Sequence, residues 1–195
     1  MNTEMNYRWW LIAIGVILVI SLIIYSNFFL HKNSPELKVV FLGDKQDHVQ
    51  TLAGWTYNKW KNYDPTLTLE KSIESYQKRL NTDKVPFVLL LLNKDQPIGM
   101  VYLNEHEPMP GFEDKSPWIG DFYMLPNYDR QGLQFRRYLM RNLEGVSKNL
   151  GFKKLYVFTS DPSRVDWYME LGWKIIKTDM HHDHLVTIME YDIKD

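Results

Sequence analysis

The chain opens with a long apolar run. Residues 9–30 hold no charged side chain, and a helix of that length, rising ~1.5 Å per residue, spans a hydrocarbon layer of ~30 Å. A cleaved signal peptide has only about 7–15 apolar residues, followed by small ones, whereas His31 and Lys32 follow this run. The pattern predicts a transmembrane helix over 9–30; a buried core helix is the alternative.

The flanking residues predict how such a helix would lie. Trp9, Trp10 and Tyr25 are toward the ends of the run, where amphipathic rings favour the headgroup region. Only Arg8 precedes it, whereas three lysines follow, so the positive-inside rule favours a cytoplasmic globular domain. Residues 1–8 are then a tail, residues 31–36 a polar linker and residues 37–195 one globular domain. The lysines are Lys32, Lys38 and Lys45.

Beyond the linker, the hydrophobic positions alternate between strand-like and helix-like periods. Apolar runs rich in β-branched and aromatic residues predict strands, and apolar positions three or four apart predict amphipathic helices. Two further strands are expected after Gly172. The earlier strands are expected at 37–42, 85–92, 98–103, 118–125 and 154–159, and helices at 44–60, 68–80 and 132–150 and, more briefly, after Asp161-Pro162.

Turn and capping residues mark the ends of these elements. Asp44 is expected to cap the first helix, and Asp161 with Pro162 to open the short one. Gly151 stands where a left-handed helix cap belongs. The predicted order is βααβββαβαββ, an α/β domain with a mixed, mostly antiparallel and largely buried sheet flanked by helices.

Composition narrows the functional classes. A net charge of −1 argues against a nucleic-acid-binding protein, which needs a local excess of Lys and Arg. The chain has no cysteine, which excludes disulfides, thiolate nucleophiles and cysteine-ligated zinc.

Residues 117–134 read PWIGDFYMLPNYDRQGLQ, which is a strand, a proline and a loop close to Arg-x-x-Gly-x-Gly before a helix. This segment resembles the core motif of the GNAT superfamily of acyl-CoA-dependent N-acetyltransferases, in particular a bacterial group of unassigned substrate. Residues 155–159 and 167–173 resemble the next strand and a Phe-Tyr-x-x-Leu-Gly-Phe segment. Residues 52–60 and 105–107 look like upstream segments of that bacterial group. The similarity covers residues 37–192 and implies a GNAT-like fold.

The resemblance also implies a coenzyme A site. A Gly-containing loop before a helix offers unpaired N–H groups to an anion, although an ordinary polar loop is the alternative. The resemblance places the pyrophosphate at Arg130, Gln131, Gly132, Leu133 and Gln134, and the pantetheine arm against the backbone of Phe122, Tyr123 and Met124. Asp129 and Gln134 depart from the family pattern, since a carboxylate repels a pyrophosphate and a long side chain crowds it.

Acetyl transfer to an amine needs a base, an oxyanion donor and an acid for the departing thiolate. Tyr168 aligns with the tyrosine that is the acid in many family members; core packing is its alternative role. Glu105 is the preferred base, with an exposed surface carboxylate as its alternative. The oxyanion donor is expected to be a backbone N–H near Met124. Further base candidates are His106, Glu107 and Asp121.

The sequence gives weaker support for functional roles of other polar and aromatic residues. Arg136, Arg137 and Arg141 could reach the coenzyme A 3′-phosphate, but a solvated basic helix face is favoured. The histidines of residues 181–184 invite a metal site, but they fall in an expected loop with no distant ligand, so no metal is predicted. Three tryptophans could line an acceptor pocket or belong to the core: Trp55, Trp60 and Trp118.

The sequence thus predicts a membrane-anchored N-acetyltransferase that moves an acetyl group from acetyl-CoA to a small-molecule or protein amine by direct attack. The alternative is a catalytically weak GNAT-like module that binds acyl-CoA or a membrane partner as a sensor or scaffold, which Asp129 and Gln134 suggest. Neither hypothesis involves nucleic acid.

Overall fold

The computed structural model describes residues 14, 19–22, 25, 36–107, 109–129, 134–181 and 184–194. The chain divides into two compact units, Met1–Glu36 and Leu37–Asp195. In the first unit the described residues are exposed, and all of them except Glu36 are helical. Among the described residues no helix is long and apolar enough to cross a membrane. Most of the predicted transmembrane segment, residues 9–30, lies outside them.

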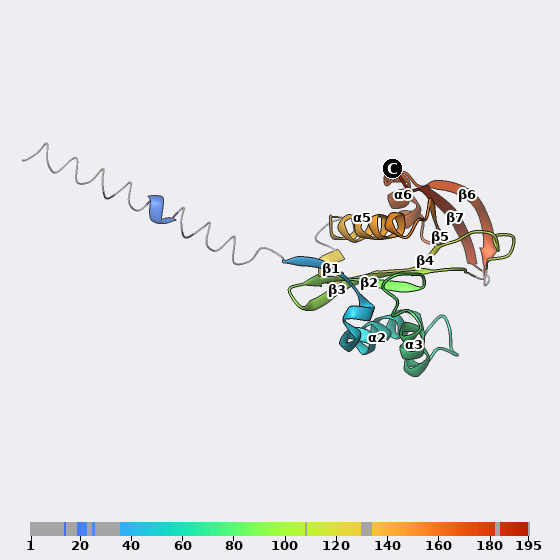
Figure 1. Ribbon diagram of the computed structural model, residues 1–195, viewed down its shortest axis with the longest axis horizontal. Helices are drawn as coiled ribbons and strands as arrows, with labels where there is room; N and C mark the ends of the chain where they lie inside the picture. The colour runs from blue at the N-terminus through green and yellow to red at the C-terminus, as the bar shows by residue number, and fades with distance from the viewer. Residues whose placement is uncertain are drawn as a thin grey trace, which may run out of the picture. The chain divides into compact units, whose positions relative to one another are not determined.

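The second unit is built on a mixed sheet with the strand order β1-β2-β3-β4-β5-β7-β6 (Figure 1). Strands β4 and β5 run parallel, and the other neighbouring pairs are antiparallel. The predicted mixed, mostly antiparallel sheet is therefore confirmed. The strands are β1 (Leu37–Phe41), β2 (Phe87–Asn93), β3 (Gln96–Asn104), β4 (Trp118–Met124), β5 (Lys154–Thr159), β6 (Lys174–His181) and β7 (His184–Asp192).

Helices cover both faces of the sheet. Figure 1 shows α2 (Val49–Trp60) and α3 (Leu69–Gln77) on one face, and α5 (Gln134–Asn149) and α6 (Pro162–Glu170) on the other. Three short elements complete the order: 3-10 helices η1 (Leu42–Asp44) and η2 (Gln46–His48), and α4 (Pro126–Asp129).

Strand β2 explains why two helical layers are needed. Its apolar run is buried throughout. Alternate side chains of a strand point to opposite faces of the sheet, so burial of the whole run requires cover on both faces. Val88, Leu90 and Leu92 join the core under α2 and α3, whereas Leu89 and Leu91 join the core under α5 and α6. A third core of buried side chains lies around Trp118 and Ile188.

Local capping chemistry sets several of the helix ends. The Asp161 side chain accepts a hydrogen bond from the Ser163 N–H at 2.9 Å and opens α6. Gly151 and Gly172 follow helices at φ of 87° and 93°, in the left-handed region that favours glycine. The prediction for Asp44 was wrong: two 3-10 turns intervene, and α2 begins at Val49 without a side-chain cap.

Candidate active site

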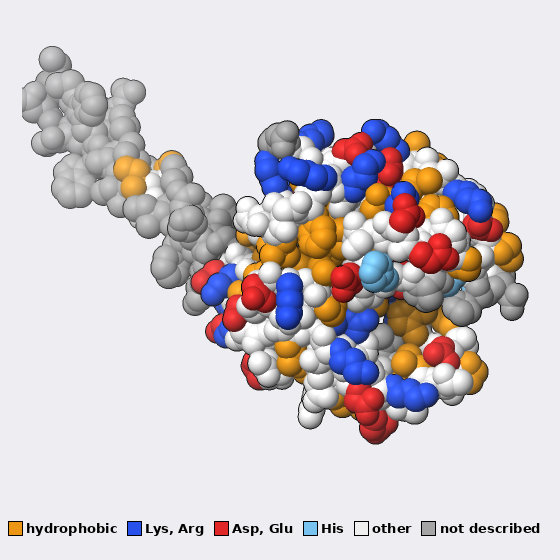
Figure 2. Space-filling model, turned by 45° about the vertical axis from the view of Figure 1, so that its right-hand side comes forward, with side chains coloured by type: hydrophobic (Ala, Val, Ile, Leu, Met, Phe, Trp, Pro, Cys, Tyr) orange, Lys and Arg blue, Asp and Glu red, His pale blue; other side chains and the backbone are white. Residues whose placement is uncertain are grey.

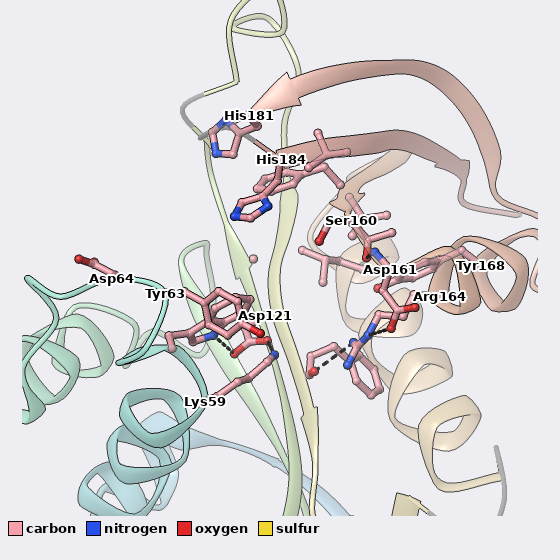
Figure 3. Close-up of a pocket in the computed structure, with 18 residues that line it drawn as sticks. Lys59, Tyr63, Asp64, Asp121, Ser160, Asp161, Arg164, Tyr168, His181 and His184 are labelled. Carbon is pink, nitrogen blue, oxygen red and sulfur yellow. Dashed lines mark hydrogen bonds and ion pairs between the residues drawn. The ribbon is translucent and has the colours of Figure 1, made fainter.

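A cleft opens where strands β4 and β5 part. In the described register, the two strands pair at Trp118 with Tyr156 and at Ile119 with Val157. Beyond these pairs the strands separate, and a cavity of about 880 Å³ is lined by residues of both. Figure 3 shows its walls, with α2 and β4 on one side and β5, α6 and the β6–β7 hairpin on the other.

A β-bulge in β4 shapes the first wall. The β3–β4 register shifts between Val101 and Leu103, so that Tyr102 faces both Gly120 and Asp121. A β-carbon at Gly120 would lie 1.9 Å from Cε2 of the Tyr102 ring, so glycine alone fits there. Bulges re-aim side chains, and both bulged residues line the cleft.

The backbone of β4 beyond the bulge offers hydrogen-bonding groups to the cleft. The N–H of Leu125 donates to a carbonyl of β3 at 2.8 Å, and successive peptide groups of a strand point to opposite edges. The backbone N–H and C=O groups of Phe122 and Met124 therefore face the gap between β4 and β5, and those of Tyr123 face β3. Arg164 of α6 reaches the Phe122 carbonyl at 3.4 Å, which agrees with this alternation. Two of the three predicted pantetheine-binding residues thus present their backbone to the cleft.

Tyr168 stands in the second wall, on α6. Its side chain is 2 % exposed and lines the cleft, and its ring packs against Trp167 and Trp173 with centroids at 5.0 Å. Burial raises the pKa of the Tyr168 phenol well above its ordinary value, and the nearby Arg164 and Arg136 oppose this only in part. The phenol therefore stays protonated at neutral pH, as a proton donor must.

Asp121 is the buried carboxylate that the fold brings to the cleft. It is 6 % exposed, and its Oδ1 accepts a hydrogen bond from the Lys59 ammonium at 2.6 Å. The Trp60 indole N–H lies 3.4 Å from Oδ2. The Lys59 ammonium also lies 4.6 Å from the Trp60 ring centroid, a cation–π contact. Figure 3 shows Lys59 and Asp121 meeting at the cleft wall.

The preferred base of the sequence analysis is not beside Tyr168. Glu105 and His106 follow β3 and are exposed, and neither lines the cleft. Partial burial raises the pKa of the Glu107 carboxyl. Glu107 accepts a hydrogen bond from Asn104 at 2.5 Å, and it does not line the cleft. The assignment of Glu105 as base stays a prediction that its position does not support.

The predicted pyrophosphate loop lies mostly outside the described residues. These undescribed positions are Arg130, Gln131, Gly132 and Leu133. Gln134 begins α5 with an exposed side chain and does not line the cleft.

Asp129 is not an unopposed negative charge. Arg136 holds its carboxylate from two nitrogens, one of them at 2.9 Å. The Arg136 guanidinium also lies near the rings of Phe122 and Trp167, 5.8 and 5.9 Å from their centroids. The repulsion that would weaken pyrophosphate binding is therefore offset locally, which removes one motive for the catalytically weak alternative.

The remaining candidates divide between the cleft and other places. Trp60 lines the cleft, whereas Trp55 stacks on Tyr123 at 5.1 Å and Trp118 belongs to a core. Arg137 pairs with Glu170 of α6 at 2.8 Å, and Arg141 is exposed.

The histidines of the β6–β7 hairpin lie at the cleft. His181 ends β6 and His184 begins β7, where the sequence suggested a loop, and both line the cavity. Residues 182 and 183 lie outside the described part. Within that part, no group of three or more His, Cys, Asp or Glu side chains is placed to hold a metal ion.

Sequence reasoning missed several residues of the cleft. Lys59, Tyr63 and Asp64 come from the end of α2 and the turn after it, and Arg164 comes from α6. The chain gives no local pattern for them. The first three reach the cleft only because α2 packs beside β4, and Arg164 reaches it only because α6 packs beside β5. The prediction from the sequence that came closest was Trp60 as a possible pocket residue.

The fold and the cleft have counterparts among known proteins. The model of the acetyltransferase (GNAT) family matches residues 49–173, more than half of the chain. Among curated proteins, no relative matches the chain at a significant level.

Solved structures share the fold at low sequence identity. An aminoglycoside 6′-acetyltransferase type Ii is 15 % identical with a TM-score of 0.62, over 81 % of this chain and 98 % of its own. A putative acetyltransferase from Salmonella typhimurium, solved with its cofactor acetyl-CoA, is 13 % identical with a TM-score of 0.61, over 82 % and 95 %. Mutant forms of a spermidine/spermine N-acetyltransferase from Vibrio cholerae are 17 % identical with a TM-score of 0.58, over 80 % and 95 %.

The family match and the splayed strands agree with the resemblance noted in the sequence. The chain belongs to the acetyltransferase (GNAT) family and is an N-acetyltransferase.

Proposed function

We propose that this chain acetylates a primary amine by direct attack on acetyl-CoA, with Asp121 as the proton acceptor and Tyr168 as the proton donor. The observation that carries the proposal is the pairing of these two groups across one cleft. Asp121 lies on β4 and Tyr168 on α6, and both line the gap that the parting strands create.

Each wall of the cleft supplies a group that the reaction needs. A primary ammonium titrates near ~10.4 and must lose a proton before its nitrogen can attack the thioester carbon. As the C–N bond forms, the N–H of Phe122 or Met124 can donate to the oxyanion. The C–S bond then breaks, and the thiolate takes the phenolic proton of Tyr168. Of the two protons that the ammonium loses, one passes through Asp121 to solvent and the other restores Tyr168.

The Lys59 contact supports an alkylammonium acceptor. In the described cleft the Asp121 carboxylate already holds a primary ammonium at 2.6 Å, with the Trp60 ring beside it. Lys59 is 26 % exposed, so its head can move toward solvent. An acceptor with the same cationic group can then take the vacated contact.

We further propose that residues 9–30 anchor the enzyme in a membrane, with the globular unit in the cytoplasm. The support is the uncharged run itself and the lysines that follow it. Several described residues of the run carry exposed apolar side chains, 46 % exposed for Ile14 and 67 % for Leu22. Reporter fusions at each end of the run test the topology, and an extracytoplasmic globular unit would contradict the proposal.

The full-length chain in mild detergent provides the test of activity. Calorimetry with acetyl-CoA measures donor binding, and a thiol-release assay with a panel of primary alkylamines measures transfer. We expect binding and turnover, both kept in Asp64→Asn, which changes an exposed carboxylate at the cleft mouth. Binding without turnover of any amine would contradict the enzymatic proposal in favour of a sensor, and absence of binding would contradict both.

A further inference from the structure

Lys59 places a primary amine of the chain itself inside the candidate active site. It lies in the last turn of α2, and among the described residues that line the cleft it is the only lysine. Its ammonium donates a hydrogen bond to Oδ1 of Asp121 at 2.6 Å, and Figure 3 shows the two side chains meeting at the cleft wall. The chain's own amine therefore occupies the contact that the proposed function gives to the acceptor.

The surroundings of Lys59 hold its ammonium without enclosing it. The Asp121 carboxylate is buried, whereas the Lys59 side chain keeps 26 % of its surface exposed. On its other side the ammonium faces the ring of Trp60, which is itself partly exposed. Because a lysine carries its charge on a flexible four-carbon stem, the nitrogen can turn into the cleft while α2 stays in place.

The backbone of β4 sets where a bound thioester would lie relative to this amine. Phe122 follows Asp121 directly in β4, and its backbone N–H faces the gap between the strands. A strand advances by only about 3.3 Å per residue. A thioester carbonyl that accepts a hydrogen bond from this N–H would therefore lie next to the residue that holds the Lys59 nitrogen. Tyr168 lines the same cavity from the opposite wall.

A second lysine at the same helix end has a different environment. Lys61 is exposed and donates a hydrogen bond to the Asn58 side chain at 3.2 Å. Its ammonium lies 5.4 Å from the centroid of the Tyr57 ring, and it does not line the cleft. Lys61 thus offers the same chemical group two positions along the chain, away from Asp121 and Tyr168.

We propose that Lys59 is a self-acetylation site, at which the enzyme transfers an acetyl group from acetyl-CoA to the amine of its own Lys59. The inference rests on the proposed function, because it uses the same proton acceptor, Asp121, and the same proton donor, Tyr168. Acetylation removes the positive charge of Lys59, and the modified side chain then no longer pairs with Asp121. The carboxylate is left for the ammonium of an external acceptor.

The step balances in atoms and charge. The Lys59 ammonium loses one proton through Asp121 to solvent, and the neutral nitrogen attacks the thioester carbon. As the C–N bond forms and the C–S bond breaks, the coenzyme A thiolate takes the phenolic proton of Tyr168. The second proton of the nitrogen restores the phenol. The products are an acetylated lysine, coenzyme A with a free thiol, and one proton.

The positions of the lysines permit a direct test by peptide mass spectrometry. The full-length chain in mild detergent is incubated with isotopically labelled acetyl-CoA and no amine, and is then digested with trypsin. Trypsin cleaves after an unmodified lysine but not after an acetylated one, so acetylation of Lys59 replaces the peptide 46–59 by the peptide 46–61. Labelling of Lys59 should be at least about tenfold faster than that of Lys61, because only Lys59 contacts a proton acceptor.

Four variants separate enzymatic transfer from chemical acetylation by the thioester. Lys59→Arg keeps the positive charge but removes the acceptor amine and should lose the label, whereas Lys61→Arg should keep it. Asp121→Asn should label Lys59 at least about tenfold more slowly, because it lacks the proton acceptor. Tyr168→Phe leaves the contact of Lys59 with Asp121 intact and should also be slower, which keeps the test decisive if Asp121→Asn does not fold.

A mixture of two variants tests whether the transfer stays within one chain. Lys59→Arg supplies an active site without the acceptor lysine, and Asp121→Asn supplies Lys59 without the proton acceptor. The Asp121→Asn chain should gain no more label in the mixture than alone. A clear gain would show transfer between chains and overturn self-acetylation in this form.

Other outcomes would also overturn the proposal. Equal labelling of Lys59 and Lys61, or labelling of Lys59 that neither Asp121→Asn nor Tyr168→Phe slows, would mean chemical acetylation. If the chain acetylates amines of the panel while Lys59 stays unmodified, this inference fails and the proposed function stands. If acetyl-CoA binds but neither Lys59 nor any amine is acetylated, both fail.

Discussion

The two walls of the cleft hold their acidic groups in opposite ways. On the β4 wall, the Asp121 carboxylate is buried with a counter-ion, the Lys59 ammonium at 2.6 Å. On the α6 wall, Tyr168 is buried among Trp167 and Trp173, and burial raises the pKa of its phenol. One wall therefore holds an ion pair, and the other holds a phenol whose ionisation is opposed by burial.

This difference indicates a division of labour. Buried charges persist in proteins when they are paired, and a neutral acid persists where no strong counter-charge favours its ionised form. Environments that treat two titratable groups differently are a recurring way to assign acid and base roles within one site. The predictions below remove or alter the groups of one wall at a time.

The largest effect is expected from the β4 wall. Asp121→Asn removes the proton acceptor, and because general base catalysis contributes on the order of 10²–10⁴-fold, turnover should fall about 100-fold or more. Acetyl-CoA binding by calorimetry should change little. Asp64→Asn, at the cleft mouth, is the matched control and should retain turnover. Near-normal turnover of Asp121→Asn at neutral pH would remove Asp121 from the mechanism.

The α6 wall should give the next effect. Tyr168→Phe keeps the packing with Trp167 and Trp173 but cannot donate a proton, so turnover should fall about tenfold or more with acetyl-CoA affinity retained. A thiol-release assay under donor saturation measures this. If the variant turns over like the wild type, Tyr168 has only a packing role.

Alkaline pH should have a smaller effect, a loss of stability through ionisation of tyrosines that include Tyr168 on the α6 wall. The pKa of Tyr168 is raised by burial in the folded state, and the pKa values of the buried Tyr76 and the partly buried Tyr102 are raised chiefly by burial as well. A raised pKa adds stability that is complete below the unfolded value of about 10 and is lost as pH rises through the folded value. The melting temperature should hold to about pH 10 and decline above it.

The absorbance of phenolate near 295 nm identifies the cause of that decline. We expect the buried tyrosines to ionise only as the chain unfolds, and Tyr168→Phe to reduce the alkaline loss of stability. Ionisation of all tyrosines near pH 10 without unfolding would contradict the raised pKa values.

The smallest effect concerns Asp129, beside the undescribed loop. Asp129→Asn removes the anion that Arg136 holds. Acetyl-CoA affinity should then rise by about threefold at most, and less so at high salt, since screening weakens the freed charge. A loss of more than about tenfold would mean that Asp129 has a positioning role in donor binding.

Much of the fold could be predicted because its elements are locally specified. Strand β5 begins and ends at the predicted residues, and α6 opens at the predicted Asp161-Pro162 pair. The start of α2 could not be placed from Asp44, because the competing 3-10 turns bring the chain from the edge strand β1 to the helix. The path of these turns depends on the position of β1, which the residues of the turns alone do not specify.

The site was predicted less completely. Tyr168 and the backbone of β4 could be found from the motif that carries them, since motif and structure are both local. Lys59 and Asp121 are 62 positions apart in the chain, and only the packing of α2 beside the bulge of β4 joins them. Glu105 has a suitable side chain at a strand end, but its position is exposed.

The sequence alone determined the α/β architecture, the family resemblance and the apolar N-terminal run, because periodicity, caps and turns act over a few residues. Tertiary structure decided which carboxylate is buried in the cleft, that Arg136 neutralises Asp129, and that β6 is left as an exposed edge. Those outcomes depend on burial and on contacts between distant segments, and the energy of a charge or an apolar side chain is set by what surrounds it in space.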